Sequence, residues 1–436
     1  MSKIASFNDE KTLIAITSFP NPKDGQQGSK EFNAVGWHSE KTLRRLSSHA
    51  PVVAMAEQRN GTSLRRVSND LLVKRVWKKG SPLSFLLMLK SILRLNKIKH
   101  LFVQFEFNVF GGIIPNLALL FMLAFLRILG RTVTFELHQV ITDIALLKKH
   151  INITNPIIQR FFNLSLGMFY RILGLVASDI IVFEEELKNR LSNFVPENKI
   201  HVLSLAVEPK KIISKPKARN LTKLPQDEFV LLVFGFINGY KGIDWILKAL
   251  KDYQGKKVRL VIAGGENPYL KDQTHYQKFY QSIVREAKKQ SHVTLTGFIP
   301  ESEVASYFGA SDLVIMPYEV FMAASGPFSL ALSYQKPVIL SDVLEDYAKS
   351  TDFAEALSRT KLQPQDIFFS LNSKSLIEHI EKAQASKSYY KKLGTFAKTL
   401  GELRSTQSVT KRLYALMTSN PLPSPALKRE KRLSLN

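Results

Sequence analysis

Residues 231–250 read LLVFGFINGYKGIDWILKAL, and the pattern of an apolar run ending in glycine or proline returns before residue 342. The later segments are RLVIAGG (259–265), HVTLTGFIPESEVASYFGASDLVIMPY (292–318) and SGPFSLALSYQKPVILSD (325–342). We interpret the whole stretch as four buried strands with helical patterns after them, which is typical of a parallel sheet. Because ligands of such sheets bind at the carboxyl ends of the strands, the loops here are expected to hold a phosphate or a nucleoside.

The N-terminal half shows the same alternation of strands and helices. Its predicted strands are 13–19, 51–57, 100–107, 131–138, 178–185 and 199–208. The polar, proline-containing segment 209–225 shows neither helical nor strand periodicity, and it marks the domain boundary. The sequence therefore predicts an α/β protein of two doubly wound, Rossmann-like domains, 1–215 and 216–395. A helix over 396–418 and a disordered basic tail over 419–436 complete the expected organisation.

Composition narrows the class of protein. The 436 residues, of which 45% are hydrophobic and 22% charged, suit a globular chain with more than one core. There is no cysteine, which excludes disulfides, zinc clusters of the cysteine type and a thiol nucleophile. The first 20 residues place acidic side chains where a secretory signal needs its apolar region. We therefore expect a cytoplasmic protein.

The formal net charge of +24 calls for an anionic partner or surface. The cations do not alternate with aromatic residues as in a nucleic-acid platform, so we expect no nucleic-acid partner. Residues 81–100 combine helical apolar spacing with cations, which fits both an anionic membrane surface and a solvated helix packed on the sheet. The apolar run 117–126 is about half as long as a membrane-spanning helix, and it indicates a buried or membrane-dipping helix. Any contact with the cell membrane is thus expected to be peripheral, on its inner face.

The order and spacing of the motifs in 231–342 resemble the donor domain of GT-B glycosyltransferases of family 4. The resemblance is closest to members that read GFxxxYKG before a Ser-Gly loop, and it covers residues 11–415. It implies that 1–215 binds the acceptor, that 216–395 binds a nucleotide sugar, and that the helix 396–418 crosses back onto the first domain. It also implies retaining transfer of a hexose from a nucleoside diphosphate sugar to a hydroxyl acceptor, with a lipid-linked or cell-surface saccharide precursor as the expected acceptor.

Two loops are the candidates for holding the diphosphate. Cations and backbone N–H groups stabilise the charge that grows on a departing diphosphate. Lys241 stands where the family places such a lysine, in a loop with Asn238 and Gly239; an ordinary surface lysine is the alternative. Ser325 and Gly326 open a helix whose free N–H groups suit an anion, although a merely well-capped helix needs the same residues.

The sequence departs from the family at the donor site. The usual arginine before the lysine is missing, since its candidate positions are Phe236 and Asn238. The paired glutamates of the family fall at Met322 and Leu330. Glu319 is the nearest carboxylate that could replace the first of them.

Further donor contacts are expected from two other regions. Gly297, Phe298 and the nearby Tyr318 are candidates for nucleobase recognition, although aromatic residues there are equally good core residues. Gly25 and Gly28, in the loop after the first strand, allow close approach to the donor phosphates. A flexible connection would have the same glycines.

The first domain supplies the candidate catalytic residues. His138 ends a predicted strand, where family members carry a histidine that contacts the transferred sugar; a core or surface histidine is the alternative. Glu106, in QFEFNVFGG, is the weaker candidate for an acceptor or sugar contact. No Asp-x-Asp lies near a strand end, so we expect no essential metal and no cofactor beyond the nucleotide-sugar substrate. The run 184–186 is interpreted as a solvated helix start.

Two other functions stay open. One is a non-catalytic GT-B-like binding protein, favoured by the missing glutamates and arginine. The other is a nucleotide-sugar epimerase on the same fold, which would move protons with carboxylates.

Overall fold

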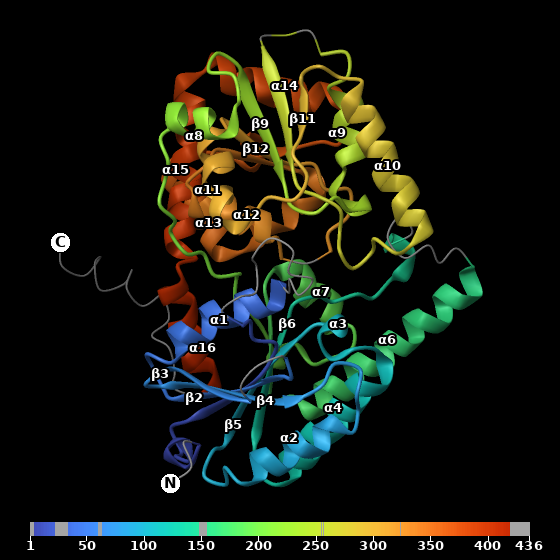
Figure 1. Ribbon diagram of the computed structural model, residues 1–436, viewed down its shortest axis with the longest axis vertical. Helices are drawn as coiled ribbons and strands as arrows, with labels where there is room; N and C mark the ends of the chain where they lie inside the picture. Colours follow the sequence, from blue (N-terminus) through green and yellow to red (C-terminus); the bar gives the residue numbers. More distant parts are fainter. Residues whose placement is uncertain are drawn as a thin grey trace, which may run out of the picture.

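The computed structural model describes residues 4–21, 34–59, 63–147, 155–253, 255, 257–322 and 324–418. Two sheets organise these residues, one in each half of the chain, with helices packed on them (Figure 1). The predicted fold class, two α/β domains built on parallel sheets, is confirmed. The predicted basic tail, 419–436, lies outside the described residues.

The N-terminal sheet has eight strands in the order β3-β4-β2-β1-β5-β6-β7-β8 and is parallel except at its β3 edge. The strands are β1 (Leu13–Ile16), β2 (Val52–Glu57), β3 (Leu64–Ser68), β4 (Leu71–Trp77), β5 (His100–Phe105), β6 (Thr132–Leu137), β7 (Asp179–Val182) and β8 (Ile200–Val202). The hairpin of β3 and β4 is absent from the sequence-based prediction.

The C-terminal sheet is parallel throughout, in the order β11-β10-β9-β12-β13-β14. Its strands are β9 (Phe229–Phe234), β10 (Val258–Ala263), β11 (Val293–Leu295), β12 (Leu313–Met316), β13 (Val338–Ser341) and β14 (Phe368–Phe369). The motif stretch thus holds the four buried strands that were predicted, together with a fifth strand that was not. The additional strand, β11, is a short, half-buried edge strand, whereas the other four are largely buried.

Helices cover both sheets. In the N-terminal half they are α1 (Ala34–Leu46), α2 (Ser84–Leu93), α3 (Phe107–Phe110), α4 (Ile113–Ile128), α6 (Pro156–Val176) and α7 (Glu185–Ser192). In the C-terminal half they are α8 (Lys215–Thr222), α9 (Ile243–Ala249), α10 (Thr274–Lys288), α11 (Glu301–Ala310), α12 (Gly326–Ser333), α13 (Thr351–Thr360), α14 (Ser373–Ala385), α15 (Lys387–Leu403) and α16 (Thr406–Met417). None of the described helices is both long and apolar enough to cross a membrane.

The last helix returns to the first domain. Figure 1 shows α16 beside α1, at the opposite end of the colour scale. Leu413 and Met417 of α16 share an apolar cluster with Leu43 and Leu46 of α1. The chain passes between the domains twice, near Val207 and near Arg404. The N–H of Val207 donates to the carbonyl of Arg404 at 2.8 Å, so these two crossings lie side by side.

A buried ion cluster joins the domains at these crossings. The Arg404 guanidinium donates to Glu184 after β7 (3.0 Å) and to Asp352 of α13 (2.9 and 3.1 Å). Burial raises the pKa of Glu184 to about 7 although Arg404 opposes the rise, and the second carboxylate oxygen of Glu184 has no partner. Burial would also raise the pKa of Asp352, but Arg404, Ser350 and Ser204 hold it at about 2. The prediction that Glu184 is solvated is therefore wrong.

Candidate active site

The predicted donor residues of the second domain lie in loops at the carboxyl ends of its strands. Two close backbone approaches fix these loops. A Cβ atom on Gly264 would lie 2.0 Å from the carbonyl oxygen of Gly235. A Cβ on Gly242, where φ is +66°, would lie 1.8 Å from the carbonyl oxygen of Pro317. Only glycine fits at these positions, so the loops after β9, β10 and β12 hold one another in place.

Lys241 ends the 3-10 turn Gly239–Lys241 and is almost fully buried. Among the described residues, no carboxylate forms an ion pair with it, and burial lowers its pKa to about 8. Its Nζ lies 2.7 Å from the point where Gly235 would carry a Cβ, and Cγ of Pro327 lies 3.3 Å from the same point. The amine therefore sits beside the first turn of α12, and the part of the chain that the structure describes offers it no paired carboxylate.

The start of α12 is capped and ordered by side chains. Ser325 Oγ accepts from the N–H of Phe328 at 3.3 Å and lies 3.1 Å from the hydroxyl of Tyr318. Gly326 is exposed, with no atom within 4 Å of its missing Cβ. Lys241 and the free N–H groups of this helix start thus face the same region, which suits an anion.

Replacing Ser325 by alanine should lower the free energy of unfolding by about 1–2 kcal/mol, because it removes the cap and a partner of the buried Tyr318 hydroxyl. Urea denaturation measures the loss. Ser386→Ala is the matched control, since Ser386 caps α15 through Tyr389. Both variants should lose stability, but only Ser325→Ala should also weaken binding of a nucleoside diphosphate. Equal binding by the two variants would contradict the assignment of Ser325 to the donor site.

The remaining residues of the Lys241 loop are largely buried. Asn238 Oδ1 accepts from Nδ2 of Asn267 at 2.8 Å, which ties the loop to the segment after β10. Gly239 is buried in the 3-10 turn. The structure therefore places Asn238 and Gly239 as the support on which Lys241 stands.

The expected nucleobase residues separate into an accessible and a buried part. Phe298 is 49% exposed and stacks on Phe236, with ring centroids 6.3 Å apart. Gly297 before it has a φ of +72° and open space around it. Tyr318 is buried, and its hydroxyl contacts Ser325. Of the two predicted aromatic rings, only that of Phe298 is open to a base.

The loop after β12 carries Glu319 in place of the family glutamates. Its N–H donates to the carbonyl of Tyr240 at 2.8 Å. Its Cγ is 3.5 Å from the missing Cβ of Gly242, so the half-buried carboxylate belongs to the Lys241 loop. Met322 and Leu330, where the family glutamates were expected, are buried and half-buried apolar residues.

His138 in the first domain belongs to a cluster around Glu136. Glu136 Oε1 lies 2.9 Å from Nε2 of His38 and 3.3 Å from Nε2 of His138, and it accepts from Gln104 at 2.8 Å. Burial would raise the pKa of Glu136, but the two histidines hold it far below its usual range. His38, Glu136 and His138 could ligate a metal ion. The distances are those of direct contact, however, so here the carboxylate itself links the rings.

Glu136 and His38 are absent from the sequence-based prediction. The first could have been found, because residues two apart on a strand share one face and Glu136 precedes His138 by two. His38 comes from α1, and no local pattern connects it to β6.

Glu106 follows β5 and precedes α3. Burial raises the pKa of its carboxyl, while His138 and Lys79 act in the opposite direction. Desolvation raises the pKa values of the half-buried Tyr240 and the more exposed Tyr269 of the second domain, and the charge of Glu106 adds to both shifts. Glu106 therefore lies within electrostatic range of both His138 and the Lys241 loop. Gly25 and Gly28, the other first-domain candidates, lie outside the described residues.

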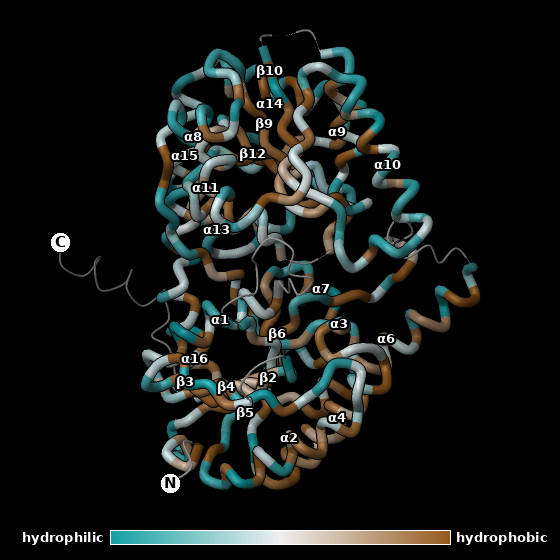
Figure 2. Tube along the Cα trace, in the orientation of Figure 1, coloured by the Kyte–Doolittle hydropathy of each residue, from teal (hydrophilic) through white to brown (hydrophobic). Residues whose placement is uncertain are grey.

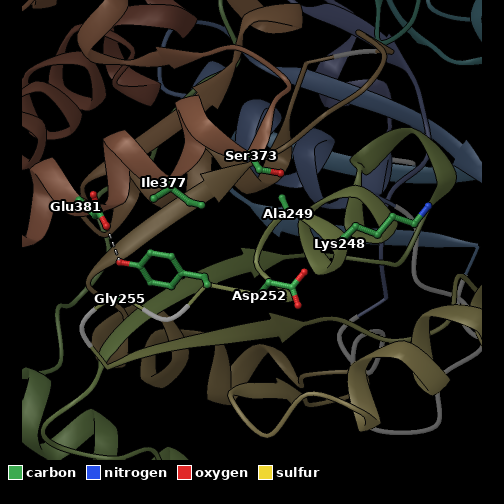
Figure 3. A pocket seen from close by; sticks show the side chains of 8 residues that line it. Lys248, Ala249, Asp252, Gly255, Ser373, Ile377 and Glu381 are labelled. Atoms are coloured by element: carbon green, nitrogen blue, oxygen red, sulfur yellow. Dashed lines mark hydrogen bonds between the residues drawn. The ribbon is translucent and has the colours of Figure 1, made fainter.

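A cavity of about 480 Å³ between α9 and α14 lies elsewhere (Figure 3). Residues 248–253, which line one side, precede β10, so the cavity is at the amino-terminal edge of the sheet. Its lining combines the carboxylates of Asp252 and Glu381 with the amine of Lys248. The predicted donor residues lie at the opposite edge, at the carboxyl ends of the strands.

Comparison with known proteins finds a family match in the C-terminal half of the chain. Residues 214–399 match the family described as glycosyl transferases group 1. The C-terminal domain belongs to the group 1 glycosyltransferases. A segment of 111 residues is 32% identical to the GDP-mannose:glycolipid 4-beta-D-mannosyltransferase of Xanthomonas campestris pv. campestris. It covers 25% of this chain and only 29% of that relative.

Solved structures extend the likeness of the group 1 domain to the whole fold. The sucrose-phosphate synthase of Thermosynechococcus elongatus superposes with a TM-score of 0.67 at 14% identity, over 94% of this chain and 98% of the other. Anabaena HepE in complex with UDP gives 0.63 at 16% identity, over 94% and 100%. WaaG, a glycosyltransferase involved in lipopolysaccharide biosynthesis, gives 0.58 at 12%, over 94% and 100%. The chain therefore has the two-domain GT-B fold.

Proposed function

We propose that the chain is a glycosyltransferase that moves a hexose from a nucleoside diphosphate sugar to a hydroxyl acceptor. The observation that carries this proposal is Lys241, a buried amine beside the start of α12 that has no ion-pair partner among the described residues. A buried cation costs free energy unless it is paired, so the site is prepared for an anion from outside. Its place in a group 1 domain makes a diphosphate the fitting anion.

In the proposed reaction the bond between the sugar C1 and the diphosphate oxygen breaks, and the electron pair leaves with the diphosphate. Lys241 and the free N–H groups at the start of α12, where Ser325 and Gly326 lie, stabilise the growing charge. The acceptor oxygen bonds to C1 on the same face with retention, and its proton passes to the departing phosphate oxygen. His138 and Glu106 would contact the sugar and the acceptor from the first domain.

The remaining donor contacts follow from the same loops. Phe298 and Gly297 would receive the base, and Glu319 the sugar, while Tyr318, Asn238 and Gly239 support the diphosphate loops. We propose residues 1–215 as the acceptor domain and 216–395 as the donor domain.

A lipid-linked or cell-surface saccharide precursor is the proposed acceptor, at the cytoplasmic face of the cell membrane. The support is a relative that is named for transfer to a glycolipid. It is limited to the matched quarter of the chain.

A second candidate is a protein that binds a nucleotide sugar without transferring it. Met322 and Leu330 favour this function, because the carboxylates that usually hold the donor sugar are replaced by apolar side chains.

Thermal unfolding in the presence of UDP-, GDP- and ADP-sugars tests the proposal. At a concentration of about 100 Kd, the matching donor should raise the melting temperature by about 5 °C. Hexose transfer from that donor to saccharide acceptors is then measured by release of the nucleoside diphosphate. If no nucleotide sugar changes the melting temperature, the proposal is wrong, and binding without transfer would support the second candidate.

A further inference from the structure

Exposed large apolar side chains gather on three neighbouring helices. Among the described residues, all but four of them (Ile212, Leu221, Tyr269 and Phe298) lie on α2, α4 and α6 or at their ends. Helix α2 packs beside α4, and α4 beside α6, so the three form one surface (Figures 1 and 2). We call it the apolar helix face; it consists of Leu83, Leu86, Leu87, Leu93, Ile113, Ile114, Phe121, Phe125, Ile128, Leu129, Ile157, Ile158, Phe161, Leu164, Met168, Ile172 and Leu175.

In helix α6 the exposed apolar residues recur at regular helical spacing and are not scattered. Its opposite side packs on the core through Tyr170 and Leu173. The outward side repeats at helical spacing with Ile157, Phe161, Leu164, Met168 and Leu175. A helix that is apolar on both sides normally has a partner on both. Contiguous exposed apolar surface on this scale marks an interaction site.

The charges of the face are all of one sign. The sequences of α2, α4 and α6 contain no aspartate and no glutamate. They contain Lys90, Arg127, Arg160 and Arg171, and Arg94 follows at the end of α2. A second copy of this chain would bring like charges together, whereas anionic lipid headgroups would attract them. Apolar side chains ringed by cations are typical of helices that lie in a membrane interface.

We propose that the apolar helix face docks on an anionic membrane leaflet, with α2, α4 and α6 lying in the plane of the interface. The apolar side chains would enter the boundary of headgroups and acyl chains, and the cations would remain at headgroup level. This docking rests on the surface of the first domain and does not require the transfer reaction.

The face begins close along the chain to a residue of the candidate active site. Ile113 and Ile114, which are 70% and 69% exposed, begin α4. Only α3 and two glycines separate them from Glu106. Docking would therefore bring Glu106, the candidate acceptor contact, toward the lipid surface. For this step, which rests on the proposed function, a lipid-linked acceptor could reach Glu106 without leaving the leaflet.

Co-sedimentation with vesicles tests the docking. The wild-type protein should bind vesicles that contain phosphatidylglycerol, and added salt or pure phosphatidylcholine should weaken the binding. The double variant Phe161→Glu/Leu164→Glu should bind at least about tenfold more weakly than the wild type. Leu221→Glu, at an exposed apolar position outside the face, is the matched control and should bind like the wild type.

A charge-reversal pair separates the electrostatic contribution. Lys90→Glu/Arg94→Glu should lower binding to anionic vesicles by about fivefold or more per cation, whereas Lys271→Glu/Lys288→Glu, at exposed positions of the other domain, should not. Circular dichroism and the nucleotide-sugar melting shift confirm that each variant is folded, independently of lipid. Docking is wrong if the Phe161/Leu164 variant binds vesicles like the wild type, or if lipid charge has no effect. The docking proposal would also be overturned if the wild type bound no lipid but formed a concentration-dependent dimer that these substitutions dissociate. The face would then serve self-association.

Discussion

Arg404→Leu should lower the free energy of unfolding by about 3–5 kcal/mol, because it leaves two buried carboxylates without their cation. Arg404 is 2% exposed and bonds to Glu184, Asp352 and Ser350. Glu184 shares this cation with Asp352, and one of its oxygens already lacks a partner. Denaturant unfolding measures the loss. Arg359→Leu, which breaks an exposed pair with Glu355, should cost less than about 1 kcal/mol.

The loss should depend on pH. In the wild type, the lowered pKa of Asp352 adds stability above its ordinary value of 3.8 that disappears as the pH falls toward 2. The raised pKa of Glu184 acts oppositely, so it reduces stability as the pH rises from 4.5 through about 7. Without Arg404 both carboxyls should hold their protons to higher pH. The variant should therefore be destabilised more at pH 8 than at pH 5, and adding Glu184→Gln should restore part of the loss. A pH-independent loss would show that packing, rather than charge, holds the domains together here.

Lys241→Met should weaken binding of the donor diphosphate about 100-fold or more, because a buried cation is lost from an anion site. The free protein should not lose stability, since methionine replaces a buried charge that has no ion-pair partner among the described residues. Calorimetric titration with the nucleoside diphosphate and thermal unfolding of the free protein measure the two effects. Lys248→Met is the control, since Lys248 is an exposed lysine at the end of α9.

The same lysine should make donor binding depend on pH. Its pKa of about 8 in the free protein means that the amine is charged below pH 8 and neutral above it. A bound diphosphate favours the charged form, so the affinity should be constant below pH 8 and fall up to about tenfold per unit above it. Arginine stays charged throughout, so whatever affinity Lys241→Arg retains should not fall in this range. Affinity that is equal in Lys241→Met and the wild type would remove Lys241 from the donor site.

The fold could be predicted where each strand is buried on both faces. The apolar runs of β9 and β12 end at Gly235 and Pro317. In a chain where helices alternate with such short runs, this pattern predicts buried strands of a parallel sheet. The β3–β4 hairpin was not predicted, because its strands carry Arg65, Arg66 and Arg75, which interrupt the apolar pattern of a buried strand. Arg75 is nevertheless buried, since backbone carbonyls of Phe19 and Glu57 accept its hydrogen bonds. Partners that satisfy a buried cation from distant loops leave no local pattern.

The candidate site divides in the same way. Lys241 and Ser325 lie in motifs of a few consecutive residues, so the sequence points to them directly. His38 meets Glu136 across 98 positions, and Arg404 meets Glu184 across 220. Only the folded chain brings such residues together. Their meeting points, one beside His138 and one at the domain junction, could not be inferred from spacing.

The return of α16 to the first domain has a consequence for dividing the protein. A fragment that ends at residue 215 would lack Leu413 and Met417, and it would leave the apolar surface around Leu43 and Leu46 uncovered. A stand-alone first domain would thus need residues 406–417 joined to it, for example after the crossing strand at Val207. The two crossings lie close enough for such a graft, because Val207 and Ser405 already form a bridge. The two domains have their own sheets, but β1 and α16, which lie near opposite ends of the described chain, both belong to the first domain.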